Sequence, residues 1–185
     1  MADITTAMVK ALREQTGAGI MDCRRALEEA DGDAARAEEI LRAKGAAAAA
    51  KKAGRAANQG IVEPYIHLGG RIGAMVELNC ETDFVARNPE FKALARELAM
   101  QVAAMNPRFL SADEIPDDLV AEHGGDRRRA AEELALLDQP FIRTPSRAVR
   151  ELVNDAVGKI GENIVVRRFI RFEVGAAAKN ETASQ

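Results

Sequence analysis

The sequence predicts an α+β fold in which a three-helix N-terminal domain precedes an antiparallel three-stranded sheet packed with helices. Apolar residues recur with the helical period up to residue 44, whereas after residue 60 they alternate with the period of a strand. A second alternating run occupies 163–175, after two further helical patterns. The expected division of the chain is a helical domain at 1–45, a connector at 46–60, a core at 61–175 and a disordered tail at 176–185.

The N-terminal domain is expected to hold three short helices between residues 5 and 44. Gly17 and Gly19 bracket the first turn, and Asp33 is placed to cap the third helix. The apolar stripes of these helices are Met8, Val9 and Leu12; Cys23, Ala26, Leu27 and Ala30; and Ala37, Ile40 and Leu41. About forty residues is a size at which core burial alone gives marginal stability, so we expect the surface of this domain to have a role beyond folding.

The connector at 46–60 is rich in alanine, basic, and without large apolar residues. Alanine favours helix strongly, while small polar sequences form flexible linkers. A helical connector and a flexible one therefore both fit.

The core is expected to begin with two strands, at 60–67 and 71–80, joined by a turn at Gly69 and Gly70. Pro64 cannot donate to a neighbouring strand, which favours either an edge position or an irregular start for the first strand. The last strand should place one set of side chains on a single side, apart from Arg168. That set is Ile164, Val166, Ile170, Phe172 and Val174.

Two helices of the core have clear boundaries in the sequence. Asn88 is placed to cap the first, which ends before Pro107; its stripe is Phe91, Leu94, Ala95, Leu98, Val102 and Met105. Ser146 is expected to cap the second, and Gly161 to end it. The stripe of that helix is Val149, Leu152, Val153, Ala156, Val157 and Ile160. A further helix is expected at 127–137.

Composition narrows the class of protein. Hydrophobic residues make up 47% and charged residues 30%, which is typical of a globular protein. The net charge of -3 does not provide the basic surface that nucleic-acid binding needs. The N-terminus resembles neither a signal peptide nor a membrane span, so we expect a cytoplasmic, reducing setting in which Cys23 and Cys80 are buried thiols.

The residue patterns do not favour catalysis or a bound cofactor. The sequence contains neither a G-x-x-x-x-G-K-[ST] phosphate loop nor a G-x-G-x-x-G motif, and neither cysteine has metal-ligand spacing to a second ligand. The one candidate nucleophile with a base is Cys80 with His67. Because Cys80 continues an alternation of core residues, a buried thiol is the favoured interpretation of it.

The segment ELNCETDFVARN, at 77–88, places an acid and an aromatic side by side where a strand should end. Residue type alone leaves two interpretations of this pair open. Phe84 could fold back over the helix that begins at Asn88, with Asp83 capping a turn. Alternatively, the end of the strand displays Phe84 and Asp83 outward, toward another protein.

Three stretches carry a resemblance to a known family: LREQTGAGIMDCRRAL at 12–27, NCETDFVARN at 79–88 and GENIVVRRF at 161–169. They closely resemble the bacterial elongation factor Ts family, whose members are guanine-nucleotide exchange factors for elongation factor Tu. The similarity spans the chain from residue 2 to about residue 174. It implies that the N-terminal helices form a ubiquitin-associated-like domain and that the chain is the short form with a single core.

The resemblance also implies which residues act. Thr82, Asp83, Phe84 and Val85 match the family's intruding element, which disturbs the magnesium and phosphate site of elongation factor Tu and promotes release of GDP. The residues that match the docking region are Val9, Leu12, Arg13, Gly17, Ile20 and Met21. The expected partners are elongation factor Tu, GDP-bound and nucleotide-free, and a second copy of the chain in a 2:2 complex, without nucleic acid or membrane. Two alternatives are a helical interaction module without exchange activity and a thiol enzyme that uses Cys80.

Overall fold

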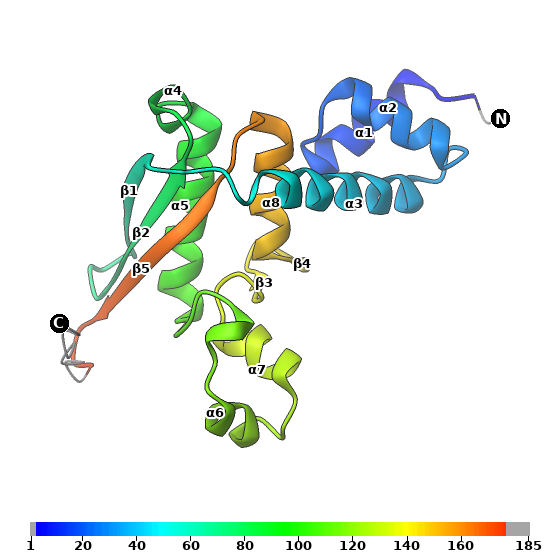
Figure 1. Cartoon of the computed structure of the whole chain (residues 1–185). Helices are drawn as coiled ribbons and strands as arrows, with labels where there is room; N and C mark the ends of the chain where they lie inside the picture. Colours follow the sequence, from blue (N-terminus) through cyan, green and yellow to red (C-terminus); the bar gives the residue numbers. More distant parts are fainter. Residues whose placement is uncertain (1–2, 177–185) are drawn as a thin grey trace.

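The computed structural model describes residues 3–176, in which three helices extend to one side of a core of sheet and helices (Figure 1). The helical part contains α1 (Thr6–Thr16), α2 (Ile20–Glu29) and α3 (Ala34–Lys52). The core contains β1 (Gln59–Ile66), β2 (Ile72–Cys80), α4 (Asp83–Ala86), α5 (Pro89–Met105), the 3-10 helix η1 (Ala112–Glu114), α6 (Asp117–Glu122), α7 (Arg127–Leu134), β3 (Pro140–Phe141), β4 (Thr144–Ala148), α8 (Val149–Ile160) and β5 (Val165–Glu173). The α+β class is confirmed, and the expected tail at 176–185 lies outside the described residues except for Ala176.

The first two N-terminal helices, and the start of the third, form where the sequence predicts them. The Asp33 carboxylate accepts hydrogen bonds from the backbone N–H groups of Ala35 and Arg36, at 2.9 and 3.1 Å, and so caps α3. The predicted stripes meet in a separate small core. Its buried members are Val9, Leu12, Cys23, Ala26, Leu27, Ala30 and Ala37.

Helix α3 does not end near residue 44 but continues through Gly45 to Lys52, across the expected start of the connector. It packs against α8, and Gly45 is buried at this contact. A Cβ atom at Gly45 would lie 3.1 Å from the Asp155 carboxylate and 3.7 Å from the backbone oxygen of Asn154. The glycine therefore allows the two helices to approach closely, and the first part of the connector is helical.

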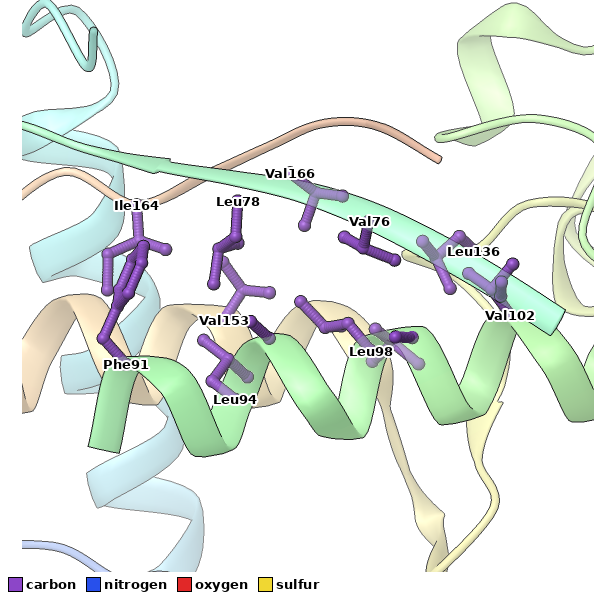
Figure 2. Packing of buried hydrophobic residues seen from close by; sticks show 14 of the residues in the cluster. Val76, Leu78, Phe91, Leu94, Leu98, Val102, Leu136, Val153, Ile164 and Val166 are labelled. Atoms are coloured by element: carbon purple, nitrogen blue, oxygen red, sulfur yellow. The ribbon is translucent and has the colours of Figure 1, made fainter. Parts of the chain in front are cut away.

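The main sheet is antiparallel with the strand order β1-β2-β5, so β1 is an edge strand, which is one of the two alternatives that Pro64 left open. Gly69 and Gly70, both with positive φ, form the turn between β1 and β2. Helix α5 lies along one face of this sheet, and their side chains interdigitate in the main core (Figure 2). Residues labelled there include Val76, Leu78, Phe91, Leu94, Leu98, Val102, Val153, Ile164 and Val166.

Some predicted details of the core are wrong. Ser146 does not cap a helix, because it lies within β4 and α8 begins three residues later, at Val149. Helix α7 ends at Leu134 rather than at 137, because Ala135 is extended and bridges to Phe109. Met105 is 42% exposed in the last turn of α5, whereas the other members of its predicted stripe are buried.

The last strand contains a bulge that the sequence pattern did not reveal. Glu77 of β2 pairs with Arg168, but the next residue of β2, Leu78, pairs with Val166, so Arg167 is an extra residue in β5. An extra residue reverses which side chains face the core. Val166 is therefore buried, whereas Ile170 and Phe172 are 36% and 60% exposed on the opposite face. The prediction that these residues share one side is wrong.

The bulge leaves one face of the sheet apolar and uncovered, opposite α5. We call it the outer sheet face; its apolar members are Val62, Ile66, Met75, Ile170 and Phe172. Met75 and Gly73 lie at its centre, in register with Ile170 and Phe172 of β5. Exposed contiguous apolar surface of this kind is typical of an interaction site.

Candidate functional site

Helix α4 displays the aromatic side chain that the sequence singled out. This short helix directly follows β2. The hydroxyl of Thr82 accepts a hydrogen bond from the backbone N–H of Val85, at 3.4 Å, and so caps the N-terminus of the helix. Ala86 is buried and Val85 is half-buried against the main core, which anchors α4. Phe84 points away from this anchor and is 79% exposed. The interpretation that Phe84 covers the following helix is therefore wrong for the free chain.

Asp83 lies beside Phe84 and pairs with Arg87, one turn along, at 2.5 Å. Both side chains are solvent-exposed, and an exposed ion pair contributes at most about 1 kcal/mol. A partner can therefore take over the Asp83 carboxylate at little cost. The site thus offers one apolar and one anionic group, side by side.

The proposed docking residues divide into two sets. Val9 and Leu12 are buried in the small core and are not available for contact with a partner. The others are exposed around the turn between α1 and α2; they are Arg13, Gly17, Ile20 and Met21. Gly17 ends α1 with a positive φ of 68°, a conformation that favours glycine. Ile20 and Met21 are 57% and 59% exposed and provide apolar contact area.

The nucleophile pair that the sequence suggested does not form. Cys80 ends β2 next to Gln59, whereas His67 follows β1 at the opposite end of the hairpin, where its Nδ1 lies 3.3 Å from the Tyr65 hydroxyl. The Cys80 thiol is buried and donates to the backbone oxygen of Thr82 at 3.1 Å. Burial first, and the charge of Glu162 second, raise the pKa of Cys80 to about 11. Cys80 is therefore a protonated thiol at neutral pH.

Within residues 3–176, His, Cys, Asp and Glu side chains do not gather into a group that could hold a metal ion. The helices of this same range are also too short or too polar to cross a membrane. Three exposed surfaces remain in the part of the chain that the structure describes: one on α4, one at the α1–α2 turn, and the outer sheet face. Helix α3 links the N-terminal helices to the core, where it packs against α8 (Figure 1).

The fold and these exposed surfaces indicate a protein that acts by binding a partner protein. Comparison with known proteins gives the family. Residues 48–125 match the family model described as elongation factor TS. The chain is 50% identical to elongation factor Ts of Carboxydothermus hydrogenoformans over 201 aligned residues, covering 96% of this chain and 93% of that one. It is also 50% identical to elongation factor Ts of Anaeromyxobacter sp. strain Fw109-5, covering 95% and 90%.

A third relative, elongation factor Ts of Finegoldia magna, is 47% identical and covers 98% of this chain and 95% of its own. The chain belongs to the elongation factor Ts family, in its short form, whose members are nucleotide exchange factors for elongation factor Tu. The alternatives of an interaction module without exchange activity and of a thiol enzyme are therefore set aside.

Proposed function

We propose that this chain promotes release of GDP from elongation factor Tu by inserting Phe84 next to the partner's magnesium and phosphate site. The observation that carries the proposal is the display of Phe84, 79% exposed, on a helix anchored by Val85 and Ala86. Burial of a phenylalanine side chain contributes about 1.5–3 kcal/mol. Asp83 acts beside it by competing for the groups that hold the magnesium ion and its water shell.

Exchange requires that the factor bind the nucleotide-free partner more tightly than the GDP-bound partner. The coupling is reciprocal, so that the factor weakens nucleotide binding by the same ratio by which nucleotide weakens binding of the factor. Contacts at α4 provide this difference because they form fully only when the nucleotide site is disturbed. Contacts that are equal in both states shift nothing.

The second contact is the docking surface at the α1–α2 turn. Arg13, Gly17, Ile20 and Met21 contact the nucleotide-binding domain of elongation factor Tu, and the buried Val9 and Leu12 hold the two helices that present them. This surface supplies affinity in both nucleotide states.

The division of the chain into a docking domain at 1–45, a connector at 46–60 and a core at 61–175 stays a prediction. In this division α3 is the rigid link between the docking domain and the core.

The outer sheet face is the proposed contact with a second copy of the chain. Its members come from all three strands. Helix α5 covers only the opposite face of the sheet, so this face is exposed in the single chain. A twofold dimer brings the same apolar patch together from both copies, which covers it in each. With one partner bound per copy, the assembly is a 2:2 complex with elongation factor Tu.

The test is the release of a fluorescent GDP analogue from elongation factor Tu after rapid mixing with the factor. Wild-type factor should accelerate release, and Phe84→Ala should still associate but accelerate release much less. Release by Phe84→Ala at the wild-type rate would overturn the proposed role of Phe84.

A further inference from the structure

Two segments far apart in the sequence hold each other immediately before α4. One oxygen of the Glu162 carboxylate accepts from the backbone N–H groups of Glu81 and Thr82, each at 3.0 Å. The other oxygen accepts from the Thr82 hydroxyl at 2.6 Å. In return, the Glu81 carboxylate accepts from the backbone N–H of Asn163 at 2.6 Å. We call this reciprocal arrangement the Glu81–Glu162 junction.

The junction also reaches the segment that follows α3. The Asn163 side chain is buried, and its amide donates to the backbone oxygens of Arg55 and Ala53, at 2.8 and 3.5 Å. The Arg55 guanidinium in turn donates to the Glu81 carboxylate at 3.3 Å. The chain that leaves the helical domain is therefore tied to the same few groups as the end of β2.

The position of Glu162 in the chain indicates that these bonds are its main role. It follows Gly161, directly after the C-terminal end of α8, where the helix dipole disfavours a negative charge. An acid at such a place needs other partners to be favourable. Glu162 finds them in two backbone N–H groups and one hydroxyl, which are strong, charge-assisted hydrogen bonds.

We propose that Glu162 is a positioning residue for nucleotide exchange. Its carboxylate fixes Thr82, the N-cap residue immediately before α4, and Phe84 is only two residues further along the chain. Because the junction also holds 53–55, it fixes Phe84 relative to the docking surface, so that both reach one molecule of elongation factor Tu together. The inference rests on the proposed function of Phe84 and assigns the residue that orients it.

The main variants are Glu162→Ala and Glu162→Gln, compared in the GDP-release assay at increasing factor concentration. The alanine variant should lower the maximal release rate by about tenfold and leave the half-saturating concentration unchanged, because docking on GDP-bound partner is intact. Glutamine keeps an oxygen that can accept from both backbone N–H groups, so it should restore most of the rate. A wild-type rate in Glu162→Ala would overturn the proposal.

The matched control is Asp126→Ala. Asp126 also accepts two backbone N–H bonds with one carboxylate oxygen, from Arg128 and Arg129 at 3.0 and 3.2 Å, but it does so at the start of α7, far from α4 (Figure 1). It should lose comparable stability, measured as melting temperature, with a wild-type release rate. A rate as low as that of Glu162→Ala would show that loss of stability alone explains the effect, against a positioning role.

The double variant Phe84→Ala with Glu162→Ala distinguishes this inference from the function on which it rests. If Glu162 acts through Phe84, the double variant should release GDP about as slowly as Phe84→Ala alone. A double variant in which the two fold-reductions of the release rate multiply fully would refute the positioning role. A wild-type rate in Phe84→Ala would refute the proposed function of Phe84, whereas a slow Phe84→Ala with a normal Glu162→Ala would refute only the positioning role.

Alkylation of Cys80 gives a readout that does not depend on exchange. Cys80 is buried beneath the segment that Glu162 holds, and Cys23, buried in the small core, is an internal reference. Loss of the junction should expose Cys80 and raise its alkylation rate in Glu162→Ala above that in Glu162→Gln, which removes the same charge. Cys23 should not change. Equal rates at Cys80 in the two variants would contradict the proposal.

Discussion

Truncation of Phe84 should slow GDP release without a large change in the stability of the factor. Because this side chain is 79% exposed, Phe84→Ala removes few contacts within the factor, and the free energy of unfolding should change by less than about 0.5 kcal/mol. In the complex the same side chain is expected to be buried, which contributes about 1.5–3 kcal/mol. Since about 1.4 kcal/mol corresponds to a factor of ten, the maximal rate of GDP release should fall by about ten- to a hundredfold.

The assay should be carried out at increasing factor concentration, so that the maximal release rate and the half-saturating concentration are measured separately. Phe84→Leu keeps a branched apolar side chain and should give an intermediate maximal rate. Leu68→Ala is the matched control, because Leu68 is 91% exposed in the turn between β1 and β2 and is not a member of any of the three proposed surfaces. It should release GDP at the wild-type rate.

Two results would refute the role of Phe84. The first is an unchanged maximal rate in Phe84→Ala. The second is an increase of the half-saturating concentration with the maximal rate retained. That second result would show that Phe84 contributes equally to both nucleotide states of the partner, as a docking residue does, and an equal contribution cannot drive release.

The other surfaces and the junction give further predictions. Met21→Ala should raise the half-saturating concentration about fivefold while the maximal release rate is retained, because an exposed docking contact contributes about 1 kcal/mol. Phe172→Asp should convert a dimer into a monomer in light scattering, because it places a charge in the apolar outer sheet face; an unchanged mass would contradict the proposed interface. Acid should weaken the junction, because the N–H of Asn163 first, and Arg55 second, hold the pKa of Glu81 below its ordinary value of 4.5. That stability is complete above pH 4.5 and is lost as the pH falls through the lower pKa of the folded state, so the melting temperature should fall more steeply there in wild type than in Glu81→Gln.

Features fixed by neighbouring residues could be predicted from the sequence. Asp33 and Asn88 cap helices in the structure because a cap depends on a side chain and the backbone two or three residues away. Gly161 ends α8 for the same local reason, with a positive φ of 89°. The two strands around Gly69 and Gly70 also follow from a short stretch of sequence.

Features fixed by distant partners could not be predicted. The bulge at Arg167 depends on how β5 pairs with β2, about ninety residues earlier, and the alternation of apolar residues in β5 continues across it without a sign. Ser146 has the residue type of a cap, but pairing of β4 with β3 keeps it extended. Local preference is overridden there by a tertiary contact.

The candidate site shows the same division. The motif at 79–88 indicates Asp83 and Phe84, but their exposure depends on Val85 and Ala86, which anchor α4 in a core built by α5 and the sheet. The role of Glu162 was missed because its partners are eighty residues away. One signal was present, since an acid directly after a helix C-terminus is unfavourable unless another part of the chain stabilises it.

The exposure of Phe84 and that of the outer sheet face have different physical meanings. A single exposed aromatic is common on soluble surfaces, whereas a contiguous apolar face from three strands favours a permanent cover. Burial of Phe84 within its own chain would weaken its action on the partner, because the ring would lose those internal contacts when it enters the partner. The conformation with Phe84 exposed would then be a minor one, and the apparent affinity of the factor for elongation factor Tu would fall in proportion to its population. An exposed but fixed Phe84 avoids this loss. Its neighbours fix it instead of burial of its own ring: Val85 and Ala86 pack against the core, and Glu162 holds the backbone before α4.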